Sequence, residues 1–288
     1  MNTADEVFAA ERPRLLGLAY RILSSYTDAE DVVQESWIRW QGIEVNTIEH
    51  PVAYLTTIVT RLALDRARTI ARRREHYVGP WLPEPIAIQR TPEDHAEIAE
   101  SLTLGFLMVL DRLSPTERAV WLLADVFGEP YGLIASAVGK SEAACRQIAA
   151  RARRRLREER PEPPQRLDPR LLRQLLAAVS TGDLKGTLEL LHADVVLISD
   201  GGSEHRAARH PVVGADRVAR LAINLSRRGE MTSIREATVN GAAAFVVEVN
   251  GSMPIVITGE QHEGKITCIY LLLNEDKLGS LAANPVIT

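Results

Sequence analysis

Two proline-rich stretches constrain this chain of 288 residues more than any other feature of its sequence. Residues 77–94 contain four prolines, and residues 160–165 read RPEPPQ. Proline inside a helix removes a backbone hydrogen bond and clashes with the preceding turn, so no continuous helix can run through either stretch. The chain is therefore expected to fold as two or three domains, with an extended linker at the first stretch and a domain boundary at the second.

The part before the first stretch has the pattern of amphipathic helices. In residues 28–40, DAEDVVQESWIRW, three apolar side chains recur at helical spacing and form one stripe: Val33, Trp37 and Trp40. Acidic residues fill the first turns of this segment, where the helix dipole favours negative charge. Pro51 is expected to open a further helix at its first turn. Residues 1–75 are thus predicted to be helical throughout.

Arginine gathers in two places, although the net charge of the whole chain is −4. Six arginines and one acid lie in residues 61–74, and six arginines and no acid lie in residues 146–157. Clustered positive charge of this kind indicates binding of a polyanion. The second cluster lies in a pattern of helix, turn and helix, in which Gly139 separates residues 133–138 from residues 141–157.

The pattern changes after the second proline-rich stretch. Two segments, residues 171–179 and residues 211–227, have helical spacing. Four others are rich in apolar and β-branched residues and are expected to be strands: residues 194–200, 242–251, 254–261 and 264–274. Helices combined with several antiparallel strands predict an α+β domain.

Two strings resemble regions 2 and 4 of the extracytoplasmic-function sigma factors of the bacterial sigma-70 family: LAYRILSSYTDAEDVVQE and YGLIASAVGKSEAACRQIAARARRRL. A third, GEQHEGKITCIYLLLNEDKL, is similar to the last hairpin of SnoaL-like domains, which have the cone-shaped NTF2-like fold. The resemblance implies a multidomain protein with an all-α N-terminal half, made of a region 2 helical bundle and a region 4 helix-turn-helix, and an α+β C-terminal cone. It divides the chain into region 2 (residues 1–76), a linker (77–107), region 4 (108–160) and a SnoaL-like regulatory domain (166–288).

The resemblance implies that core RNA polymerase and promoter DNA are the partners. Residues 28–40 would dock on the clamp helices of the polymerase β′ subunit through Asp31, Gln34 and Glu35. The helix of the first arginine cluster would meet the −10 element and capture a base flipped from the melted strand. The residues expected there are Tyr54, Thr57, Arg61, Arg68 and Arg72. Many family members have asparagine at the position of Arg61.

The second helix of a helix-turn-helix enters the major groove, where Arg pairs with guanine, Gln with adenine and Glu with the cytosine amino group. The residues expected to reach base edges at the −35 element are Ser141, Glu142, Arg146 and Gln147. Further along, the arginines are expected to bind phosphates, which give affinity rather than sequence choice: Arg151, Arg153, Arg154, Arg155 and Arg157. Cys145 and Ile148 are expected to face the domain core.

Three short strings, WLPEP, DGG and NEDKL, resemble those of sigma factors that carry a fused SnoaL-like domain. In this group the extra domain packs on the linker between regions 2 and 4 and adjusts activity in cis. The usual second string is DGGGK, whereas Glu204 replaces the basic residue here, and the usual third string has proline where Glu275 stands. The residues implied in the contact are Trp81, Leu82, Pro83, Asp200, Gly201, Gly202, Asn274 and Lys277.

Two other functions fit parts of the sequence. SnoaL-like domains often hold a conical cavity that catalyses cyclisation or isomerisation, and the same cavity in this chain is a candidate site for a small-molecule ligand. The candidate acid–base groups are Asp200, His205, His210 and Glu248. A DNA-binding regulator that acts without polymerase would keep the helix-turn-helix, but it would not need residues 28–40 or the first arginine cluster.

No catalytic residue, cofactor or metal ion is expected. Cys145 and Cys268 lie far apart in the sequence, have no metal-ligand spacing and are expected to be buried. The polar and acidic start of the chain is unlike a signal peptide, and no apolar run is long enough to cross a membrane. The cytoplasm is therefore the expected location.

Overall fold

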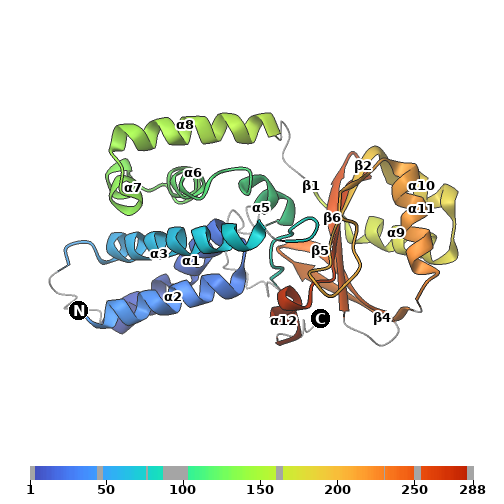
Figure 1. Ribbon diagram of the computed structural model, residues 1–288, viewed down its shortest axis with the longest axis horizontal. Coiled ribbons are helices and arrows are strands. Elements are labelled where there is room, and N and C mark those ends of the chain that lie inside the picture. The colour runs from blue at the N-terminus through green and yellow to red at the C-terminus, as the bar shows by residue number, and fades with distance from the viewer. Residues whose placement is uncertain are drawn as a thin grey trace. The chain divides into compact units, whose positions relative to one another are not determined.

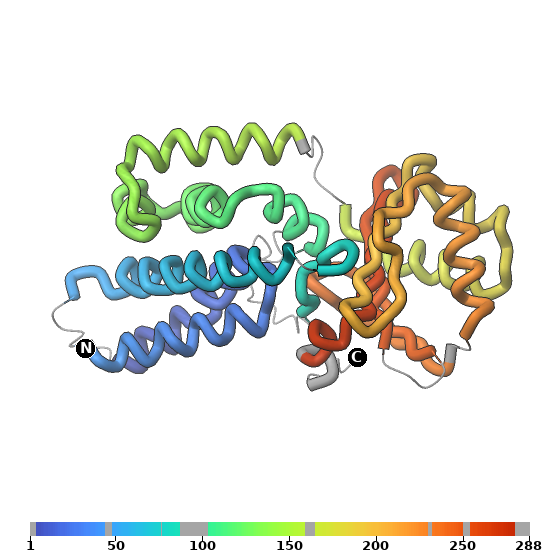
Figure 2. The backbone as a smooth tube through the Cα atoms, viewed as in Figure 1, coloured from blue at the N-terminus to red at the C-terminus, as the bar shows by residue number. Residues whose placement is uncertain are grey.

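The computed structural model of the chain describes residues 4–43, 48–75, 77–86, 103–159, 165–229, 231–249 and 254–283. The chain divides into two compact units. The first consists of Met1–Glu75 and Leu107–Glu162, and the second of His76–Phe106 and Pro163–Thr288. The linker residues 77–86 therefore belong to the second unit, where they run beside its strands (Figure 2).

Three helices that pack side by side begin the first unit: α1 (Ala4–Leu23), α2 (Tyr26–Gln41) and α3 (Pro51–Arg74) (Figure 1). Pro51 stands at the start of α3, as predicted. In the apolar stripe of α2, Val33 and Trp40 are buried. Trp37 is half-buried and lies 4.8 Å from Phe8 of α1, measured between ring centres. The stripe predicted from the sequence is thus the face by which α2 joins the bundle.

Five further elements complete the helical part: α5 (Leu104–Leu110), α6 (Pro115–Trp121), the short π-helix η2 (Leu122–Val126), α7 (Tyr131–Val138) and α8 (Glu142–Glu159). The boundary between the two units falls inside α5, after Phe106. Gly139 ends α7 with a φ of 67°, a left-handed conformation that glycine adopts without strain. The turn at Gly139 joins α7 to α8, so the predicted helix-turn-helix is confirmed.

The second unit is built on a seven-stranded sheet with the order β3-β2-β7-β6-β5-β4, and β1 pairs with β6 outside this path. The strands are β1 (Gln165–Arg166), β2 (Leu191–Asp200), β3 (Val212–Val213), β4 (Met231–Val239), β5 (Ala242–Val249), β6 (Pro254–His262) and β7 (Lys265–Leu272). The pair β2–β7 is parallel, whereas the other described pairs are antiparallel. Several antiparallel strands were predicted and are present, whereas the parallel direction of the β2–β7 pair was not predicted, because these strands are distant in sequence and no hairpin fixes their direction.

Three helices, α9 (Pro169–Thr181), α10 (Leu184–Leu190) and α11 (Ala215–Ser226), cover one face of this sheet (Figure 1). Apolar side chains of α9 and α11 form one buried cluster with β2, β5 and β7. A fourth helix, α12 (Glu275–Ala283), follows β7. The helix predicted over residues 211–227 begins only at Ala215, because Val212 and Val213 pair with β2 as a short strand.

Candidate nucleic-acid interface and linker-binding site

The start of α8 presents the residues predicted to reach base edges, and all four are exposed: Ser141, Glu142, Arg146 and Gln147. Arg146 donates a hydrogen bond to the Glu142 carboxylate at 2.7 Å, and its guanidinium lies 4.9 Å from the centre of the Tyr131 ring. Cys145 and Ile148 are buried, as predicted. One face of α8 is thus packed on its own domain, and the opposite face carries polar groups of the kind that pair with base edges.

Arg153 differs from the other arginines of α8. It donates hydrogen bonds to the Asp125 carboxylate at 2.7 Å and to the Tyr131 hydroxyl at 3.4 Å, and these bonds raise the pKa of the guanidinium. Arg153 therefore joins α8 to η2 and α7, a role that the sequence pattern did not distinguish from phosphate binding. The others are exposed: Arg151, Arg154, Arg155 and Arg157.

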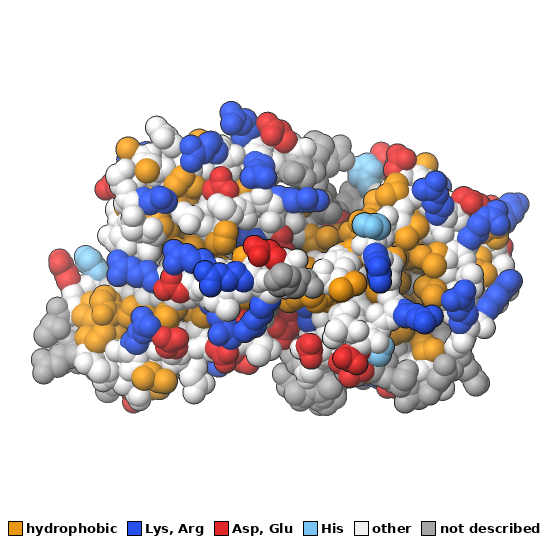
Figure 3. Space-filling view, viewed as in Figure 1, with side chains coloured by type: hydrophobic (Ala, Val, Ile, Leu, Met, Phe, Trp, Pro, Cys, Tyr) orange, Lys and Arg blue, Asp and Glu red, His pale blue; other side chains and the backbone are white. Residues whose placement is uncertain are grey.

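The residues predicted to meet the −10 element lie along α3. Tyr54, Arg61, Arg68 and Arg72 are exposed, and Thr57 is half-buried. Figure 3 shows Lys and Arg side chains gathered along α3 and along α8. Arg61 also makes a contact beyond its own helix.

The guanidinium of Arg61 donates to the backbone carbonyl oxygen of Ser136 at 2.7 Å. Ser136 belongs to α7, the first helix of the helix-turn-helix. A residue of the predicted −10 set is therefore held against the segment predicted to recognise the −35 element.

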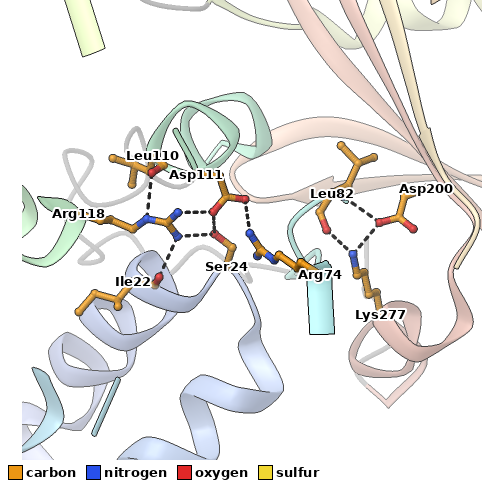
Figure 4. A network of polar contacts seen from close by, with 9 residues as sticks. All are labelled: Ile22, Ser24, Arg74, Leu82, Leu110, Asp111, Arg118, Asp200 and Lys277. Carbon is orange, nitrogen blue, oxygen red and sulfur yellow. Dashed lines mark hydrogen bonds and ion pairs between the residues drawn. The ribbon is translucent and has the colours of Figure 1, made fainter. Parts of the chain in front are cut away.

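A buried polar network joins α1 to the α5–α6 segment and the end of α3 (Figure 4). Arg118 pairs with Asp111 at 2.5 Å and donates to the backbone oxygens of Ile22 at 2.8 Å and Leu110 at 3.0 Å. Asp111 also pairs with Arg74 at 2.9 Å. Burial lowers the pKa of Arg118, and the charge of Asp111 opposes that effect. The network fixes the predicted −10 helix and the base of the helix-turn-helix in one unit.

The residues predicted to contact polymerase lie on the exposed face of α2. Asp31 pairs with Arg66 at 3.1 Å, Glu35 pairs with Arg39 at 2.6 Å, and Gln34 is exposed. The neighbouring Ile38, four residues after Gln34, is 62% exposed. Sequence reasoning did not select Ile38, because its place outside the apolar stripe of α2 emerges only when the stripe is matched to the core.

The carboxylate of Asp200, which is 1% exposed, holds the linker to the C-terminal domain (Figure 4). It accepts hydrogen bonds from the backbone N–H of Leu82 at 2.8 Å and from the Tyr77 hydroxyl. It also pairs with the Lys277 ammonium at 2.6 Å. Lys277 donates in turn to the backbone oxygen of Leu82 at 2.6 Å, and its Nζ lies 3.4 Å from the centre of the Trp81 ring.

This arrangement satisfies both buried charges and both backbone groups of Leu82. Burial and the hydrogen bond to Asp200 raise the pKa of Tyr77. Asn274 donates to the same Tyr77 oxygen at 2.8 Å. The structure thus brings together five of the residues implied in the interdomain contact, namely Trp81, Leu82, Asp200, Asn274 and Lys277, and adds Tyr77.

The two glycines of the DGG string allow the chain to turn tightly beside this site. Gly202 has a φ of 62°, and a Cβ there would lie 2.9 Å from the Asn274 side chain. A Cβ on Gly201 would meet the backbone oxygen of His205. His205 lies 2.9 Å from the Glu275 carboxylate, so the residue that replaces the usual proline has a partner in the altered DGG segment. Pro83 is buried beside Leu82.

A second attachment of the linker was not predicted. The backbone N–H of Ile86 donates to the Asn240 side-chain oxygen at 3.0 Å, and the backbone N–H of Asn240 donates to the Ile86 oxygen at 2.9 Å. Asn240 is fully buried in the turn between β4 and β5. The Asn-Gly pair at this turn is a strong hairpin signal in the sequence, but nothing in it shows that the linker binds there.

A pocket of about 290 Å³, solvent at its mouth included, lies in the second unit. It is lined by residues 103–105 together with residues of β1, β4, β5, β6 and β7, among them Glu260 and Tyr270. None of the candidate acid–base residues Asp200, His205, His210 and Glu248 is among its described lining residues. Glu260 was not selected from the sequence, because no motif surrounds it.

Within the described residues, no group of three or more His, Cys, Asp or Glu side chains is placed to hold a metal ion. In the same part of the chain, no helix is both long and apolar enough to cross a bilayer. Cys145 and Cys268 are buried, as predicted.

Comparison with known protein families gives two matches. Residues 7–74 match the model of Sigma-70 region 2, and residues 103–156 match that of Sigma-70, region 4. The chain is 35% identical over 289 residues to the ECF RNA polymerase sigma factor SigJ of Mycobacterium tuberculosis (strain ATCC 25618 / H37Rv), covering 94% of this chain and 91% of the relative. It is 32% identical over 293 residues to a probable ECF RNA polymerase sigma factor, SigI, of the same strain, with 98% of each chain covered.

The crystal structure of Mycobacterium tuberculosis SigJ, described as an extracytoplasmic function sigma factor, is similar over nearly the whole chain. The TM-score is 0.77 at 32% identity, and the match covers 97% of this chain and 99% of the other. The similarity therefore includes the C-terminal half as well as the helical half. The predicted fold class, with an all-α N-terminal half and an α+β C-terminal half, is confirmed.

Proposed function

The chain belongs to the extracytoplasmic-function (ECF) RNA polymerase sigma factors, which direct transcription initiation, and on this premise we propose that its C-terminal domain modulates initiation in cis by holding the linker between regions 2 and 4. In this proposal α2 binds the β′ clamp of core polymerase through Asp31, Gln34 and Glu35. The helix α3 meets the −10 element through Tyr54, Thr57, Arg61, Arg68 and Arg72. The helix α8 reads the −35 element through Ser141, Glu142, Arg146 and Gln147, with Arg151 and Arg154 on phosphates.

The distance between the two promoter elements indicates that the first unit must change its structure to bind a promoter. Elements centred near −10 and −35 are roughly 20–25 base pairs apart, which is roughly 70–85 Å of B-DNA. The hydrogen bond between Arg61 and Ser136 holds α3 against α7 in one compact unit. Since α7 is followed directly by α8, the contact also keeps α8 close to α3. While it persists, α3 and α8 cannot reach the −10 and −35 elements at the same time. Promoter binding therefore requires region 4 to move away from region 2.

The length of the linker supports its control by the C-terminal domain. The roughly 25 residues between Tyr77 and Thr103 would reach roughly 85 Å when fully extended. In the structure both ends of this segment lie in the second unit. A domain of its size has a radius of gyration of about 14 Å and is roughly 35 Å across. A linker held at both ends is therefore too short to let the two regions span a promoter, and a released linker is long enough.

The observation that carries the proposal is the bonding of Asp200 and Lys277 to both backbone groups of Leu82. Removal of one partner from a buried charge pair is strongly destabilising, because it leaves the other charge without compensation. Release of the linker would leave Asp200 and Lys277 without the two backbone groups of Leu82 that they now bind.

Run-off transcription with bacterial core polymerase tests the proposal. The full chain is compared with the variant Asp200→Asn, and Asp194→Asn on the same strand is the control, because Asp194 is exposed. We expect Asp200→Asn to raise promoter-specific output and Asp194→Asn to leave it unchanged. Unchanged output from Asp200→Asn would reject regulation through the linker. Failure of every variant to bind core polymerase, with duplex DNA binding retained, would favour a DNA-binding regulator that acts without polymerase.

A further inference from the structure

One wall of the pocket in the second unit is formed by Gly105, a glycine that its own helix does not require. Gly105 is the second residue of α5 and is absent from the described glycines with a positive φ. No turn therefore demands glycine at this position. Glycine is also the least favourable helix residue apart from proline. The reason for Gly105 must lie in what surrounds it.

Two buried side chains occupy the space that a side chain at this position would need. A Cβ on Gly105 would overlap the Glu260 carboxylate and lie 2.7 Å from the Tyr270 hydroxyl oxygen. Glu260 is 4% exposed and Tyr270 is 3% exposed, so neither has room to swing into solvent. Close packing of this kind admits an added methyl group only at the expense of displaced neighbours.

Regular alternation along β6 explains how Glu260 comes to face the linker. In a regular strand, successive side chains point to opposite faces, so residues two apart share a face. Thr258 and Glu260 both line the pocket, whereas Ile257 packs against the buried apolar cluster of α9, α11 and the sheet. The pleat of the strand thus turns the Glu260 carboxylate toward Gly105.

The end of the linker is further fixed at the pocket by Thr103 and Leu104, which are both buried. The Thr103 hydroxyl accepts a hydrogen bond from the Phe106 N–H at 3.2 Å and so caps the first turn of α5. These contacts share no residue with the site of Asp200 and Lys277. The linker is therefore attached to the C-terminal domain independently at its two ends.

We propose that Glu260, Tyr270 and the sheet residues around them form a peptide-binding site for residues 103–106 of the same chain, and that Gly105 is the residue this site selects. Glu260 and Tyr270 exclude any side chain at that position. The regulatory meaning of the site rests on the proposed function, because the site would hold the second end of the linker as Asp200 and Lys277 hold the first.

Hydrogen–deuterium exchange of the full-length protein tests the site directly. The variant Gly105→Ala is compared with Gly279→Ala in α12, where an added Cβ would meet nothing within 4 Å. Both changes favour a helix, so helix propensity cannot account for a difference between them. We expect the amides of residues 106–110 to exchange about tenfold faster or more in Gly105→Ala, and at the wild-type rate in Gly279→Ala.

The double variant Gly105→Ala/Glu260→Ala separates loss of fit from general damage. Removal of the carboxylate makes room for the new methyl group, so exchange should return to the rate of Glu260→Ala alone. Wild-type exchange in Gly105→Ala, or no recovery in the double variant, would overturn the inference. So would exchange of residues 106–110 in the wild-type chain at the rate of an unstructured peptide, and a small-molecule site would then take its place.

Run-off transcription with the same variants decides the proposed function separately. Faster exchange with increased output would support both the site and its regulatory role. Faster exchange with unchanged output would keep the peptide-binding site and reject regulation through it.

Discussion

The guanidinium of Arg61 in α3 donates a hydrogen bond to the backbone carbonyl oxygen of Ser136 in α7 across 2.7 Å. The two helices belong to the regions that a sigma factor applies to different promoter elements. This contact and the network around Arg118 describe a state in which α3 is held against the helix-turn-helix of α7 and α8. Four predictions concern these helices and the linker.

Base recognition by α8 should depend on Arg146 in a way that phosphate binding does not. We expect Arg146→Ala to lose about 1–3 kcal/mol of discrimination at one base pair of the −35 element. We expect Arg154→Ala to weaken binding to all sequences about equally and to lower the salt slope by about 1. Fluorescence anisotropy with single-substituted promoters at several salt concentrations measures both. Equal effects of the two variants would reject the recognition-helix assignment.

Arg153 should act on the stability of region 4. Its bonds to Asp125 and Tyr131 are partly exposed, so Arg153→Ala should lower the free energy of unfolding by about 0.5–1 kcal/mol. The salt slope of DNA binding should stay at the wild-type value, in contrast to Arg154→Ala. Urea unfolding and anisotropy on the same samples provide the comparison. A reduced salt slope in Arg153→Ala would show that this guanidinium reaches a phosphate.

The stability of the first unit should depend more on Asp111 than on an exposed acidic residue. It neutralises Arg118 and Arg74, and Arg118 is almost completely buried. The change Asp111→Asn removes the negative charge that faces the buried Arg118, and it should destabilise the unit by about 2–4 kcal/mol. The matched control is Asp65→Asn, whose exposed partner is Arg68, with an expected loss below about 0.5 kcal/mol. Similar losses in both variants, measured by urea unfolding, would contradict the role of the network.

High pH should weaken the attachment of the linker. Burial and Asp200 raise the pKa of Tyr77 above its ordinary value of 10.0, so the folded state holds this proton more tightly than the unfolded state. The Tyr77 phenol therefore makes its full contribution to the free energy of unfolding below pH 10, and this contribution is lost as the pH rises above 10.

Between about pH 9 and about pH 11, the wild-type chain should therefore lose more stability than Tyr77→Phe. Tyr54→Phe, which changes an exposed tyrosine, should follow the wild type. Urea midpoints across this range give the measurement. An identical pH dependence in wild type and Tyr77→Phe would mean that Asp200 does not bind the phenol.

Local patterns in the sequence predicted much of the fold. Three of these patterns determine structure within one or two helical turns. They are the apolar stripe of Val33 and Trp40, the proline at the start of α3, and the glycine between α7 and α8. The expected strands correspond to β2, β5, β6 and β7. The strand β4 and the helices α10 and α12 were not predicted. The parallel pairing of β2 with β7 could not be, because it joins segments about 70 residues apart by a choice of direction that neither segment encodes alone.

Some residues of the candidate sites were predicted from the sequence, and others were not. Resemblance pointed to Asp200, Asn274 and Lys277, which the structure brings together around Leu82. The partners Asn240 and Glu260 were missed. Asn240 contacts the linker through its backbone and its side chain, and Glu260 packs against Gly105 of the same linker. Neither backbone hydrogen bonding nor packing between distant segments leaves a pattern in a single sequence.

The joint burial of Asp200 and Lys277 against Leu82 also limits how the C-terminal domain can be reused. If the domain were transferred alone into another protein, the Asp200 carboxylate and the Lys277 ammonium would lose the hydrogen bonds that the linker backbone now provides. The linker segment is therefore a structural part of the domain, although Leu82 precedes Asp200 by 118 residues. An exchange of domains between sigma factors would have to carry both pieces together.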